Sequence, residues 1–79
     1  MATTGESQQF AFFQQAATEL ADKLGRLSTL EAKALRQEMR EYETTFQQWS
    51  LKGRPDDASQ VISEFLTASR KALDYLTSV

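Results

Sequence analysis

The stretch Leu27-Ser28-Thr29-Leu30-Glu31-Ala32 divides the chain, because a regular pattern of apolar residues ends at its first residue and resumes out of register at its last. The first pattern, with spacings of three and four, is formed by Phe10, Phe13, Ala17, Leu20, Leu24 and Leu27. The second pattern starts one position late and is formed by Ala32, Leu35, Met39, Tyr42, Phe46 and Trp49. Each pattern is typical of one face of a helix. Ser28 and Glu31 also have the spacing of a capping box. We therefore predict a helix boundary at Ser28, with helices over residues 7–27 and 29–52.

The residues after the second pattern predict a further turn and a third helix. Gly53 can cap the second helix in a left-handed conformation, and Pro55 blocks its continuation. Asp57 and Gln60 repeat the capping-box spacing, so we predict a third helix over residues 57–77. About half of its circumference is apolar. That half is formed by Val61, Ile62, Phe65, Leu66, Ala68, Ala72, Leu73, Tyr75 and Leu76.

The composition favours helices throughout the chain. Val and Ile are found only at positions 61, 62 and 79, and there are three glycines and one proline among the 79 residues. Good helix formers dominate the rest, and short connections make consecutive helices antiparallel. We therefore predict an all-α fold, an antiparallel up-down-up three-helix bundle. A single helical domain should cover residues 7–79, after a flexible N-terminus over residues 1–6.

Side-chain size gives a further expectation about the two ends of this bundle. In an antiparallel arrangement, the large aromatic residues of all three helices should meet at one end. These are Phe10, Phe13, Phe46, Trp49 and Phe65. Leucines should meet at the other end, namely Leu24, Leu27, Leu35 and Leu73.

The sequence lacks the residues on which most catalytic and metal sites depend. Histidine and cysteine are both absent, which excludes thiolate or imidazole metal sites and nucleophilic mechanisms built on those side chains. Glu38, Glu41 and Glu43 point to different sides of the predicted second helix and do not form a shared carboxylate site. We therefore expect no enzyme activity, no catalytic residue, no metal, no cofactor and no small-molecule substrate.

Charge and hydropathy bear on nucleic acids and membranes. The formal net charge is −2, which disfavours non-specific electrostatic binding to nucleic acid. Lys33, Arg36 and Arg40 form a basic line on the second helix, so a nucleic-acid-binding regulator that uses this line is an alternative function. No apolar run is long enough for a transmembrane helix, and no secretory signal is visible. We expect no membrane contact and a cytoplasmic location.

Protein binding has the clearest positive features. The apolar stripe of the second helix covers roughly 100° of its circumference, too little to cover the apolar half of the third helix. The excess is Leu66 and Leu73, and Phe12 lies outside the stripe of the first helix. The candidate protein-interface residues are Phe12, Ile62, Leu66, Leu73 and Leu76. A rotation of the third helix could instead bury the leucines in the core. We predict a small soluble protein-interaction module, with a regulatory, inhibitory, adaptor or chaperone-like role, that binds a protein partner or a second copy.

Two patterns invite comparison with bacterial secretion systems. The segment Trp49-Ser50-Leu51-Lys52-Gly53 is similar to the Trp-x-Gly turn of small helical hairpin proteins exported by type VII systems, but it is two residues longer. The chain is also about as long as type III needle subunits, whose turn lies nearer the middle of the chain. Neither pattern assigns the chain to a family. A secreted or assembling helical subunit of a secretion system is a further alternative function.

Overall fold

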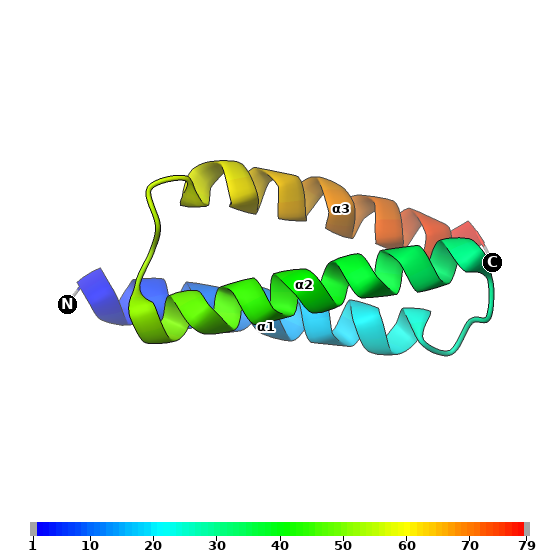
Figure 1. The fold of residues 1–79 in the computed structure, drawn as a ribbon, viewed down its shortest axis with the longest axis horizontal. Helices are drawn as coiled ribbons and strands as arrows, with labels where there is room; N and C mark the ends of the chain where they lie inside the picture. The colour runs from blue at the N-terminus through cyan, green and yellow to red at the C-terminus, as the bar shows by residue number, and fades with distance from the viewer. Residues whose placement is uncertain (1, 79) are drawn as a thin grey trace.

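The computed structural model describes the backbone of residues 2–78 and the side chains of residues 8–78. Three helices, α1 (Ala2–Leu24), α2 (Leu30–Lys52) and α3 (Ala58–Ser78), run up, down and up, and the described residues contain no strand (Figure 1). The bundle measures 42 × 19 × 17 Å. The predicted all-α, up-down-up three-helix bundle is confirmed, and α1 and α3 run in the same direction.

The ends of α1 differ from the predicted range of 7–27. The helix begins at Ala2, and the flexibility expected for residues 1–6 stays a prediction, because the structure describes no side chain before residue 8. At the other end, the amide of Gly25 still bonds to a carbonyl four residues back, but the next two amides bond three residues back. This tightening ends α1 at Leu24 and leaves Leu27 in the turn.

The helix boundary predicted near Ser28 is confirmed, but the capping residue is Thr29. Its backbone is extended, and its hydroxyl accepts a hydrogen bond from the amide of Ala32 at 3.2 Å. The predicted capping box of Ser28 and Glu31 is therefore wrong by one residue. The Thr29 hydroxyl also hydrogen-bonds to the hydroxyl of Tyr75 on α3, a tertiary contact that helps to select Thr29 over its neighbour.

The second connection begins after Lys52 as predicted, and α3 begins at Ala58, one residue later than predicted. Gly53 donates its amide to the carbonyl of Trp49 at 2.9 Å. Its φ of 102° and ψ of 170° lie outside the predicted left-handed helical region, in an extended positive-φ region that is almost exclusive to glycine. Asp57 directly precedes α3, and its carbonyl accepts hydrogen bonds from the amides of Gln60 and Val61.

The core combines small side chains between α1 and α2 with large aromatic side chains that come from all three helices. Ala17, Ala21 and Ala32 are fully buried, and side chains this small let the backbones of α1 and α2 lie close together. The five predicted aromatic residues do meet, in one network centred on Phe46, whose ring lies 4.9 Å from that of Phe65. Tyr42 joins this network.

The leucine end forms only in part. Leu24 and Leu35 are buried and Leu27 is partly buried, whereas Leu73 is exposed. The prediction that Leu73 joins the leucine end of the core is therefore wrong. None of the helices, over the residues described, has the length and apolar character that crossing a membrane requires.

Candidate interaction surface

Large apolar side chains are exposed in three places on the described surface. Phe12 is 70% exposed, Leu66 55% and Leu73 50%, and these three line one groove between α1 and α3. Leu30 and Leu51, which are 84% and 80% exposed, lie instead near the two ends of α2. Leu66 and Leu73 are thus not taken into the core by a rotation of α3.

The groove between α1 and α3, called the α1–α3 groove below, has a volume of about 260 Å³. It is lined by Phe12, Phe13, Ala16, Glu19, Leu20, Lys23, Phe65, Leu66, Ser69 and Leu73. Leu20 and Phe65 belong to the buried core and form its floor. The α1 wall consists of residues spaced four, three and four apart, which share one face of that helix. The surface therefore offers an apolar floor and apolar edges, with one acid and one base on its α1 side.

The other two predicted interface residues have a different position. Ile62 and Leu76 are partly buried and pack against the core. They lie on the same face of α3 as Leu66 and Leu73, because the four residues are spaced by three, four and seven. Contact of all five predicted residues with a partner stays a prediction, but only Phe12 and the two exposed leucines are available in large part.

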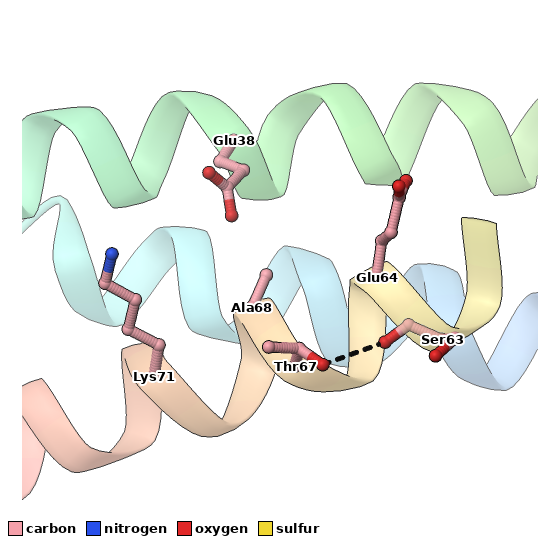
Figure 2. Close-up of a pocket in the computed structure, with 6 residues that line it drawn as sticks. All are labelled: Glu38, Ser63, Glu64, Thr67, Ala68 and Lys71. Carbon is pink, nitrogen blue, oxygen red and sulfur yellow. Dashed lines mark hydrogen bonds between the residues drawn. The ribbon is translucent and has the colours of Figure 1, made fainter. Parts of the chain in front are cut away.

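The cleft between α2 and α3 is polar. Figure 2 shows Glu38 of α2 facing Lys71 and Glu64 of α3 above Ala68. The nearby Tyr42 has its pKa raised, chiefly because burial disfavours the phenolate and further because of the negative charges of Glu38, Glu64 and Glu41. The hydroxyl of Thr67 is used within its own helix, where it donates to the carbonyl of Ser63 (Figure 2). No cluster of three or more potential metal ligands is found within the described part of the chain.

The basic line predicted on α2 is partly neutralised. Arg40 pairs with Asp22 of α1 at 3.1 Å and with Glu43 at 3.4 Å. The hydroxyl of Thr18 also contacts the Glu43 carboxylate. These side chains link α1 to α2, so Arg40 helps to hold the hairpin together. It therefore presents less net charge to a nucleic acid than the sequence pattern indicates.

Three site features were missed by reasoning from the sequence. The contact between Thr29 and Tyr75 joins residues far apart in the chain, and nothing in the local pattern signals it. Tyr42 was assigned to the stripe of the second helix but not to the aromatic end. Ser69 carries the one buried side-chain oxygen that lacks a hydrogen-bond partner among the described residues. Its position between Leu66 and Leu73 was the available signal, because it places a small side chain within the apolar strip.

Comparisons with protein-family models, with curated proteins and with solved structures find no match for the chain.

Proposed function

We propose that this protein is a small helical interaction module that binds another protein chain through the α1–α3 groove. The observation that carries the proposal is the exposure of Phe12, Leu66 and Leu73 around a single groove. Together these side chains leave on the order of 300 Å² of apolar surface in water, a size at which patches on monomeric proteins are often functional. Regulatory, inhibitory, adaptor and chaperone-like roles all depend on such a contact, and so does assembly as a subunit of a secretion system.

The size of the patch indicates what a partner must supply. Covering it would stabilise a complex by about 7 kcal/mol at 25 cal/mol per Å². Association costs roughly 4–15 kcal/mol in lost translational and rotational freedom. The patch alone is therefore not sufficient, and the partner must contribute apolar surface of its own. A protein surface or helix meets that requirement, whereas a nucleic acid backbone does not.

A cytoplasmic location is part of this proposal. The chain contains no cysteine, so its fold does not depend on the oxidising compartments in which disulfides form.

The proposal is tested with two double variants that change the same residue type by the same charge. L66E/L73E places two carboxylates on the groove, and L30E/L51E places two on α2, away from it. Each purified chain is immobilised, and proteins captured from an extract of the native host are compared. We expect proteins that bind the wild type and L30E/L51E to be lost with L66E/L73E.

Circular dichroism must show the same helix content for all three chains, so that a loss of binding cannot be caused by unfolding of the variant. Equal capture by all three folded chains would refute the role of the groove in binding other proteins. Self-binding is measured separately, from the association state of the purified chain.

A further inference from the structure

We infer that the occupant of the α1–α3 groove is a second copy of this chain, which docks antiparallel about a twofold axis perpendicular to the helices. This inference rests on the proposed function and names its partner. The supporting observations are the register of exposed side chains on the two helices and the charge on this face.

The register of α3 is symmetric about one point. Leu66 and Leu73 are seven residues apart, so their midpoint falls between Ser69 and Arg70. A twofold axis at that point sets Leu66 of one copy against Leu73 of the other, and Leu73 against Leu66. Ser69 lies next to the axis, where its small side chain allows two helices to approach closely.

The register of α1 is symmetric about a point at the same level of the bundle. Phe12 and Lys23 have their midpoint between Ala17 and Thr18, which is four and a half residues beyond Phe13. The midpoint on α3 is likewise four and a half residues beyond Phe65, and the rings of Phe13 and Phe65 are in contact at 5.8 Å. Because α1 and α3 run in the same direction (Figure 1), both midpoints lie about 7 Å along the bundle from this ring contact. One twofold axis can therefore pass through the midpoints of both helices.

The pairs that this axis creates are chemically compatible. On α1, Phe12 meets the partner's Lys23, whose aliphatic stem can cover the ring while its ammonium lies near the ring face. The small side chain of Ala16 meets the partner's Glu19. On α3, leucine meets leucine. Large side chains oppose each other at the ends of the contact, whereas the small side chains of Ala16 and Ser69 lie near its centre together with Glu19 and Arg70.

Charge also permits two copies of this face to meet. The groove carries Glu19 and Lys23 on its α1 wall, so its charges are balanced. Arg70 lies beside Leu66 on the outer side of α3 and at the level of the axis, so the Arg70 side chains of the two copies approach each other at the solvated rim, where water and salt screen their charges. The chain as a whole carries only −2, which leaves little long-range repulsion between copies at physiological ionic strength.

Sedimentation equilibrium of the purified chain is the first test, over a concentration series with wild type, L66E/L73E and L30E/L51E. We expect wild type and L30E/L51E to show the same monomer–dimer equilibrium. L66E/L73E should dissociate at least about tenfold more readily, because four carboxylates would meet at the contact. A wild type that is monomeric throughout, or a dimer equally strong in L66E/L73E, would overturn the inference.

Cysteine cross-linking tests the antiparallel register, and because the chain contains no native cysteine, only the introduced cysteines can form disulfides. L66C and L73C are oxidised separately and as a mixture. We expect the mixture to give a cross-linked dimer of one chain of each kind, in large excess over dimers formed by either variant alone. Dimers formed mainly by each variant with itself would indicate a parallel contact and overturn the antiparallel register.

The two proposals fail in different ways. A monomeric wild type that still captures other proteins through the groove would leave the proposed function standing and refute the second copy as occupant. A monomeric wild type with no groove-dependent capture would refute both.

Discussion

Replacement of Thr29 by alanine should destabilise the bundle more than any change at Ser28, although the sequence pattern favours Ser28 as the cap. T29A removes the hydroxyl that accepts from the amide of Ala32 and bonds to Tyr75. Loss of an N-cap costs about 1 kcal/mol, and loss of a partly solvated hydrogen bond between helices adds about 0.5 kcal/mol. The sum of about 1.5 kcal/mol corresponds to a fall in melting temperature of roughly 6–12 °C for a domain of this size.

Three controls separate the two contributions. T29S keeps the hydroxyl and should recover most of the stability. Y75F removes only the bond between helices and should cost about 0.5 kcal/mol. S28A should have almost no effect. In a double-mutant cycle, T29A/Y75F should be less destabilised than the sum of its single variants, because Thr29 and Tyr75 share one bond. Thermal and urea unfolding followed by circular dichroism give these values. If S28A costs as much as T29A, or if Thr29 and Tyr75 show no coupling, the assignment of the cap and its tertiary bond is wrong.

Three further predictions address the core, the second turn and pH dependence. W49A should lower the free energy of unfolding by about 3–5 kcal/mol, since Trp49 packs edge-on against Phe10 and Phe46. Tryptophan emission of the folded wild type should be blue-shifted, and emission typical of free tryptophan would contradict this packing. G53A should cost about 1–3 kcal/mol in urea unfolding, because alanine rarely adopts the φ of 102° found there, whereas no loss would show that the turn adjusts without strain. The raised pKa of Tyr42 means that the folded state holds its phenolic proton more tightly than the unfolded state. The corresponding stability is present below the unfolded pKa of about 10 and is lost as pH rises above it. Wild type should therefore lose more stability than Y42F between about pH 9 and 11. If the free energy of unfolding falls equally with pH in both proteins, Tyr42 is not the cause.

The helices could be predicted from the sequence because their signals are local. The shift of one position between the two apolar stripes was sufficient to place a boundary near Ser28, and side-chain size was sufficient to bring Phe46 and Phe65 together. The end of α1 was missed because the apolar pattern of the first helix continues to Leu27. In the structure the chain tightens immediately after Gly25.

The errors that remain share a different cause, since each depends on contacts between residues far apart in sequence. The choice between Ser28 and Thr29 as cap involves Tyr75 of α3, 46 residues away from Thr29. The exposure of Leu73 depends on how α3 lies on the hairpin of α1 and α2. The candidate surface was located in outline from the width of each stripe, whereas its groove and the positions of Ile62 and Leu76 required the packed structure.

The contrast between the close hairpin of α1 and α2 and the separate position of α3 has a consequence for folding kinetics. Contacts within the hairpin close only a short loop, so they form quickly, and their formation does not require α3. During synthesis the hairpin can therefore fold before the C-terminal helix is complete. In that interval the apolar half of α3 is in water, and the hairpin of a neighbouring chain is an equally good acceptor for it. The connection over residues 53–57 is thus the point at which an exchange of α3 between two chains would begin.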